Sequence, residues 1–175
     1  MRKIFQLLFL FTLTPLLLTL FSGCGYKPSS HYAKRVMGET VSTEVVISME
    51  DPENTVIIKD AIDAAVIMRF KSSLRDRGSA QSHLRIAFKG VSFSPLQYDE
   101  NGYVIAYRTT IRLGITRRSG TESKMYNVRG TYDFSIQAQA IISDQARFEA
   151  IRFGSAKAID SFIAMVAAEG TKTQE

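Results

Sequence analysis

The chain has 175 residues and a mass of 19.6 kDa, which corresponds to one domain. Its 45% hydrophobic and 22% charged residues are typical of a globular protein, and they exclude a disordered tail, a collagen-like repeat and a multi-span membrane protein. A single cysteine excludes an internal disulfide framework and a Cys-rich zinc site, and two histidines leave little material for metal binding. The formal net charge of +5 is too weak to indicate a nucleic-acid partner.

The N-terminus has the layout of a bacterial lipoprotein signal. A basic start, 1–3, precedes the apolar stretch 4–21, and small residues then lead to Cys24. A transmembrane anchor is the competing interpretation. Pro15 within the stretch and the small residues before Cys24 favour cleavage instead. The pattern resembles a lipobox, in which the cysteine carries diacylglycerol and an N-acyl chain; no other cofactor and no metal is predicted. The next residue is Gly25 rather than Asp, which predicts an outer-membrane lipoprotein on the periplasmic side.

This signal sets the predicted organisation of the chain. Residues 1–23 form the signal peptide, 24–40 an acylated tether, 41–170 one α+β domain and 171–175 a polar tail. The segment 25–38 shows no hydrophobic period, so no helix or strand is expected within the tether.

The first half of the domain predicts a strand, a helix and a second strand. Residues 41–49 are rich in β-branched side chains, and Asp51 followed by Pro52 marks a helix start. Apolar residues then recur every four positions as far as Leu74, and Gly78 is a plausible helix C-cap. Residues 83–93 form the next strand, in which the apolar parity switches at Gly90 and indicates a bulge.

The second half predicts a long hairpin followed by a helix. After a turn at 99–102, apolar residues alternate cleanly over 103–115 and again over 126–138, with a turn near Ser119 and Gly120. The last helix runs from about Asp144 to Glu169, with Gly170 as its C-cap.

The apolar parity of the two hairpin strands fixes their register. The parity is odd on the first strand and even on the second, so facing residue numbers sum to 241, give or take two. This register places Leu113 opposite Val128, Arg108 opposite Asp133 and Arg112 opposite Arg129.

The elements combine into an α+β fold of two layers. A four-stranded mixed sheet carries two helices on one face, in the order β-α-β-β-β-α. The right-handed crossover rule makes the first two strands parallel, and the remaining strands form an antiparallel meander.

Basic residues gather near the hairpin tip in this register. Five positive charges are predicted at one end of the polar sheet face, where Glu122 is the only nearby carboxylate. A solvated sheet face is one interpretation. The other is a site for phosphate or carboxylate groups, for which arginine is well suited by its bidentate fork. The candidate ligand-binding residues are Arg112, Arg117, Arg118, Lys124 and Arg129.

The sequence lacks the motifs of a catalyst. It has no Gly-rich loop after a strand and no Gly-x-Ser-x-Gly, and His31 and His83 lie far apart along the chain. We therefore expect no enzyme. The alternative is a lipid-anchored hydrolase, which would need a nucleophile and a base within hydrogen-bonding reach.

The lipobox continuing as Cys24-Gly25-Tyr26, together with the element order, resembles the LPS-assembly lipoprotein (LptE) family. The resemblance implies a plug inside a large LptD-type outer-membrane β-barrel that helps deliver lipopolysaccharide to the outer leaflet. It also implies that the basic residues named above contact lipopolysaccharide phosphates. The lipid on Cys24 would then hold the plug at the periplasmic mouth while the 119–122 hairpin points outward. A periplasmic scaffolding lipoprotein of another envelope complex is the alternative.

Overall fold

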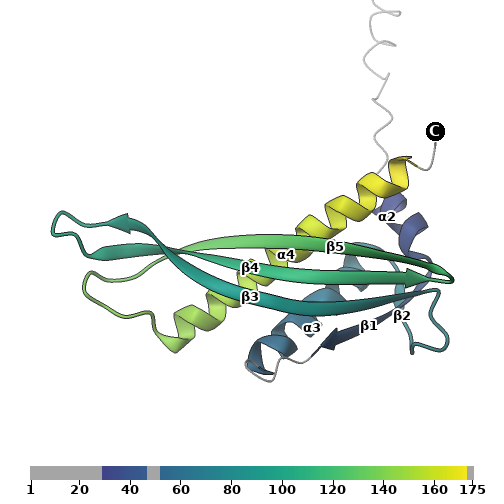
Figure 1. The fold of residues 1–175 in the computed structure, drawn as a ribbon, viewed down its shortest axis with the longest axis horizontal. Coiled ribbons are helices and arrows are strands. Elements are labelled where there is room, and N and C mark those ends of the chain that lie inside the picture. The colour runs from purple at the N-terminus through teal and green to yellow at the C-terminus, as the bar shows by residue number, and fades with distance from the viewer. Residues whose placement is uncertain (1–28, 47–51, 173–175) are drawn as a thin grey trace, which may run out of the picture.

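The computed structural model describes residues 29–46 and 52–172 (Figure 1). The predicted helix N-cap, Asp51, and the predicted strand end, 47–49, lie outside these residues. The elements are α2 (Ser29–Met37), β1 (Thr40–Val46), α3 (Pro52–Met68), β2 (Ser73–Leu74), β3 (Ser82–Tyr98), β4 (Val104–Ser119), β5 (Glu122–Ser135) and α4 (Asp144–Lys172).

The sheet is mixed, as predicted, but it has five strands rather than four. Their order is β2-β1-β3-β4-β5; β1 runs parallel to β2 and β3, and the last three strands are antiparallel. The extra strand exists because α3 ends at Met68, ten residues before the predicted cap at Gly78. Lys71 then adopts a left-handed conformation, with φ of 57°, and the chain turns so that Ser73 pairs with Thr40. Leu74, expected on the helix, lies in β2.

The helices cover one face of the sheet and leave the other open (Figure 1). Apolar side chains from that face of β3, β4 and β5 meet those of α3 and α4, as the alternation predicts. Phe70, just after α3, packs edge-on against Phe162 of α4, with ring centroids 5.8 Å apart. The largest buried side chains are Phe70, Phe162, Met37, Ile58, Ile62, Leu84, Ile86, Ile111, Leu113, Ile115, Val41 and Val66.

The register predicted for the hairpin of β4 and β5 is confirmed. Leu113 faces Val128, Arg108 faces Asp133 and Arg112 faces Arg129. The predicted bulge is also present, because the register of β3 against β4 shifts between Phe88 and Gly90. Gly90 has φ of 138°, a conformation that favours glycine.

The segment predicted to be an irregular tether contains a helix, so that expectation is wrong for 29–37. Ala33 and Met37, one helical turn apart, are fully buried in the core. The helix α2 packs closely on the end of α4, where a Cβ at Gly170 would lie 2.3 Å from the Tyr32 carbonyl oxygen. Gly170 therefore lies inside α4, which ends at Lys172, and is not the predicted C-cap.

A second glycine lets α4 lie directly on the sheet. A Cβ at Gly130 of β5 would lie 2.1 Å from the Gly154 carbonyl oxygen and 2.2 Å from the Ala158 nitrogen. No helix among residues 29–46 and 52–172 is long and apolar enough to cross a membrane.

Candidate anion-binding face

Strand alternation separates the five basic residues that the sequence grouped together. Arg112 and Arg118 of β4, like Arg129 of β5, lie on the open face of the sheet and are exposed. Arg117 and Lys124 face each other on the opposite side, towards α4. The prediction of one five-charge cluster on the polar face is therefore wrong.

Arg117 is a buried structural residue, with a side chain only 4% exposed. Its guanidinium donates hydrogen bonds to the Val36 carbonyl oxygen at 3.1 Å and to carboxylates of Glu122 and Glu169 at 3.0 Å each. Lys124 pairs with the same Glu169 at 2.8 Å. The sequence suggested that Glu122 is the only carboxylate near these cations, but the structure places Glu169 beside them as well. This network ties α2, β4, β5 and α4 together, and Arg117 has no surface to offer a ligand.

Tyr126 completes the network. Its hydroxyl donates to Glu169 at 2.6 Å and lies 3.4 Å from Nε of Arg117. Burial, followed by the hydrogen bond to Glu169, raises the pKa of Tyr126 to about 12. Burial alone would raise the pKa of Glu169. The hydrogen bonds from Lys124 and Tyr126 and the charge of Arg117 outweigh that effect and lower it below its usual range.

Three cations form a row across the open face, which we call the cationic row: Lys89 of β3, Arg112 of β4 and Arg129 of β5. Arg112 and Arg129 face each other directly, and all three side chains are exposed. None of the three has an ion-pair partner among the described residues. Two glycines lie beside the row, and Gly114 makes space for Lys89. A Cβ at Gly114 would lie 2.9 Å from Cε of Lys89, and one at Gly90 would lie 3.8 Å from Nη2 of Arg112.

Sequence reasoning missed Lys89. The residue immediately precedes Gly90, where the parity switch marked a bulge, and neither side of such a switch assigns a face. Only the structure shows that Lys89 reaches across to Gly114 on the open face.

Arg118 also has no ion pair among the described residues, but several other charges on the open face are paired. Arg108 binds Asp133 through two hydrogen bonds of 2.8 and 2.7 Å, as the register predicted. The hydrogen bond from Arg108 lowers the pKa of Asp133. Glu44 of β1 lies 3.9 Å from Arg85 and 3.6 Å from Arg77. The cationic row therefore differs from these paired charges on the same face.

One nucleophile–base contact exists on the open face. Ser42 Oγ lies 2.7 Å from Nδ1 of His83, and Nε2 of the same ring lies 3.2 Å from Glu44. The contact fits the tautomer in which Nδ1 accepts from Ser42 and Nε2–H donates to Glu44. Ser42 is only 4% exposed, so its hydroxyl is not presented to a substrate. The contact joins the neighbouring strands β1 and β3, and it favours a structural function.

The long axis of the molecule has two different ends (Figure 1). At one end the 119–122 hairpin lies with α2 and the C-terminal end of α4, which Arg117 joins through Val36 and Glu169. At the other end lies the hairpin that joins β3 and β4, which turns at 99–102. Cys24 lies outside the described residues, so the expectation that the 119–122 hairpin points away from its lipid stays a prediction.

Solved structures of similar fold include lipoproteins. Rare lipoprotein B from Shewanella oneidensis has 15% identity and a TM-score of 0.52, with 78% of this chain and 99% of that chain covered. Lipoprotein B from Nitrosomonas europaea has 12% identity and a TM-score of 0.54, with 76% and 84% covered. Protein XCC0632 from Xanthomonas campestris has 9% identity and a TM-score of 0.51, with 78% and 87% covered. At these identities the likeness shows the fold alone. A comparison with curated proteins gives no match.

The mixed sheet with its helices on one face thus defines an α+β protein of the type found in these lipoproteins. A family model described as LptE, lipopolysaccharide-assembly, matches residues 43–166, which include most of the sheet and most of α4. The chain belongs to the LptE family, a family of non-catalytic lipoproteins of lipopolysaccharide assembly in the bacterial envelope.

Proposed function

We propose that this protein is an outer-membrane lipoprotein, anchored through acylated Cys24, that occupies a large LptD-type β-barrel and binds lipopolysaccharide phosphates on its open sheet face. Membership of the LptE family supports the assignment to lipopolysaccharide assembly. The single observation that carries the binding site is the cationic row, in which Lys89, Arg112 and Arg129 are exposed without ion-pair partners among the described residues.

The arrangement of the row suits phosphate groups. Two arginines directly opposite each other repel unless an anion lies between them, and each guanidinium can donate two parallel hydrogen bonds to one phosphate. Arg118 lies further along the same face, towards the 119–122 hairpin, and would extend the contact. Arg117 is not part of the proposed site.

The remainder of the open face suits the inside of a wide barrel. Strands β4 and β5 present Thr110, Thr116, Asn127 and Thr131 there, between the charged residues. A large outer-membrane barrel has a polar interior, so a polar sheet face can lie against it without burying unpaired apolar surface.

Charge reversal of the cationic row tests the binding site. We expect replacement of Lys89, Arg112 and Arg129 by Glu to weaken binding of purified lipopolysaccharide at least tenfold, because each charged hydrogen bond to phosphate contributes about 1.5–3 kcal/mol. A matched control replaces Lys71, Arg75 and Arg152 with Glu, which makes the same change in net charge on other surfaces. Equal affinities of the two triple variants for lipopolysaccharide would show that the cationic row is only a solvated part of the sheet face and not a binding site.

The anchor and the barrel are tested separately. Cys24→Ala should abolish fractionation with the outer membrane, and normal fractionation of this variant would refute acylation at Cys24. The wild-type protein should co-purify with one large β-barrel from outer membranes. Co-purification with another envelope complex, combined with no lipopolysaccharide binding, would instead support a scaffolding lipoprotein.

A further inference from the structure

Strand β5 forms one edge of the sheet, and its backbone is open along that edge. The two-residue turn makes Ser119 and Glu122 a hydrogen-bonded pair, so the even-numbered residues of β5 direct their N–H and C=O groups to β4. The bond from Ile136 N to Ile105 O, just beyond β5, continues this alternation. The odd-numbered residues, including Met125, Asn127 and Thr131, therefore direct their backbone groups outward.

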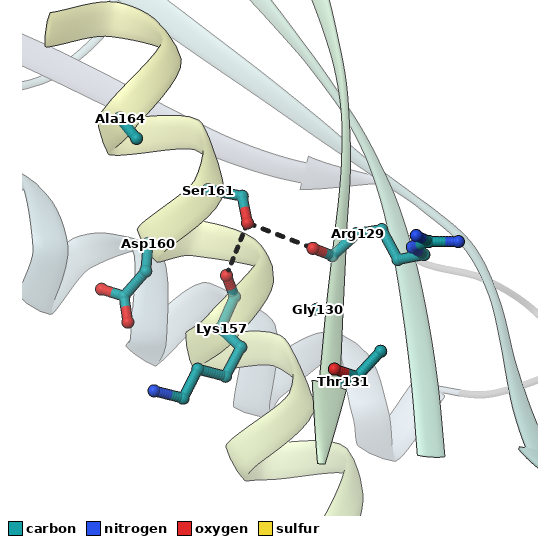
Figure 2. A pocket seen from close by; sticks show the side chains of 7 residues that line it. All are labelled: Arg129, Gly130, Thr131, Lys157, Asp160, Ser161 and Ala164. Carbon is teal, nitrogen blue, oxygen red and sulfur yellow. Dashed lines mark hydrogen bonds between the residues drawn. The ribbon is translucent and has the colours of Figure 1, made fainter. Parts of the chain in front are cut away.

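The outward groups of β5 have one partner in the described part of the chain. The Ser161 hydroxyl of α4 lies 3.2 Å from the Arg129 carbonyl oxygen, and it shares its proton with the Lys157 carbonyl oxygen at 3.1 Å (Figure 2). The other outward N–H and C=O groups are left to solvent. A row of such groups is a template for another strand.

The β5 edge differs from the other long edge of the sheet in how open it is to pairing with another strand. Within residues 29–46 and 52–172, β1 pairs with β3 as far as Ala87, and no described strand pairs with that side of β3 from there to Tyr98. That edge carries a bulge at Gly90 and a proline at Pro95, two devices by which proteins prevent strand pairing. In contrast, β5 contains no proline, and its register with β4 has no shift over 14 residues.

A groove borders the β5 edge on the side of α4. It has a volume of about 520 Å³ and is lined by Arg129, Gly130 and Thr131 of β5 and by Lys157, Asp160, Ser161 and Ala164 of α4. Figure 2 shows the flank of α4 on one side of the strand, while the Arg129 side chain leaves β5 on the other side. An added strand would direct alternate side chains into this groove and towards Arg129.

The charges beside this edge favour an acidic strand. Asp160 is paired with Arg69 at 3.0 Å, and Lys124 is paired with Glu169. Lys157 in the groove and Arg129 on the open face have no ion pair among the described residues. We propose that the outer edge of β5 and the adjoining flank of α4 form a strand-addition site for an extended acidic segment of a partner protein.

The test uses the mature protein in detergent and two blocked nine-residue peptides of β-branched residues. One peptide carries two adjacent central glutamates, which an extended strand directs to opposite faces, and the other carries two lysines. We expect saturable binding of the glutamate peptide only. Amide hydrogen exchange should slow at least tenfold at residues 125 and 127, with no change at 126 and 128, whose N–H groups already bond to β4.

Two residue changes locate the interaction. Asn127→Pro removes one outward N–H from an edge strand, and it should weaken binding of the glutamate peptide about tenfold. Its matched control, Asn127→Thr, retains the N–H and should bind within about twofold of the wild type. If Asn127→Pro fails to fold, Lys157→Glu provides a second test. This variant should bind the glutamate peptide more weakly and the lysine peptide more tightly than the wild type does.

Three results would overturn the proposal. The first is no saturable binding of the glutamate peptide, and the second is protection of amides outside β5. The third is protection of 125 and 127 without peptide in a self-associated protein, which would assign the edge to a second copy of this chain. Lipopolysaccharide binding of Lys157→Glu should equal that of the wild type, because Lys157 lies on α4 and not on the open face, so failure here is distinguishable from failure of the proposed function.

Discussion

Replacement of Arg117 by Met tests whether this arginine stabilises the fold from a buried position. The substitution retains an unbranched apolar stem but removes the guanidinium that contacts Val36, Glu122 and Glu169. Removing one partner of a buried ion pair costs about 3–5 kcal/mol. Here Glu122 is 61% exposed and loses little, while Glu169 keeps its bonds to Lys124 and Tyr126. We therefore expect a loss of about 3 kcal/mol in the free energy of unfolding.

The assay is urea unfolding of residues 25–175, with Arg118→Met as the matched control. Arg118 is the next residue on the same strand, but it is exposed on the open face, so its replacement should cost about 0.5 kcal/mol or less. In thermal unfolding the Arg117 variant should melt about 6–12 °C lower than the wild type. Equal stability of the two variants would refute the assignment of Arg117 to a buried network.

Three further predictions concern the same layers of the fold. Gly130→Ala should cost about 3 kcal/mol in unfolding free energy because its Cβ meets the backbone of α4, whereas Gly78→Ala, with open space around it, should be nearly neutral. The folded-state pKa of Tyr126 is raised, so the stability it contributes below pH 10 should disappear as pH rises towards about 12; a Tyr126→Phe variant that keeps this alkaline loss would contradict the network. Ser42→Ala should lower unfolding stability by about 1 kcal/mol in denaturant titration, and loss of a hydrolytic activity instead would restore the hydrolase alternative.

Glu169 should make the free energy of unfolding decrease at acidic pH, and this decrease is called the acid limb below. Its folded-state pKa is lowered, so the stability it contributes above pH 4.5 should be lost as pH falls below that value. Glu169→Gln should flatten this acid limb relative to the wild type in unfolding measured from pH 3 to 6. An unchanged acid limb would show that the carboxylate is not engaged by Lys124, Tyr126 and Arg117.

The sequence was most informative where one face of a strand is buried. A slip of one residue between β4 and β5 would move every apolar side chain to the open face, so parity determines the register and the Arg108–Asp133 pair. Parity also carried the signal for Arg117, since it shares the odd numbering of Ile115 and Leu113. The sequence analysis instead grouped Arg117 with Arg118 because both lie close to the turn. In the structure the two side chains lie on opposite faces of the sheet.

The elements that sequence reasoning misplaced depend on tertiary contacts. Helix α2 has only nine residues, too few to be stable alone, and it forms because Ala33 and Met37 enter a core made by distant segments. The end of α3 was hidden because Phe70 and Leu74 continue the four-residue spacing of the helix. In the folded chain Phe70 reaches the core from a turn, and Leu74 does so from a strand.

The sheet is long compared with the thickness of a membrane. Strand β4 alone, with 16 residues, extends ~50 Å from the 119–122 hairpin towards the opposite tip, whereas a bilayer with its headgroups is about 40–45 Å thick. The sheet is therefore long enough to extend from one side of such a bilayer to the other. The tip opposite α2 carries two exposed aromatic side chains, Tyr98 and Tyr103, at the far end of this length.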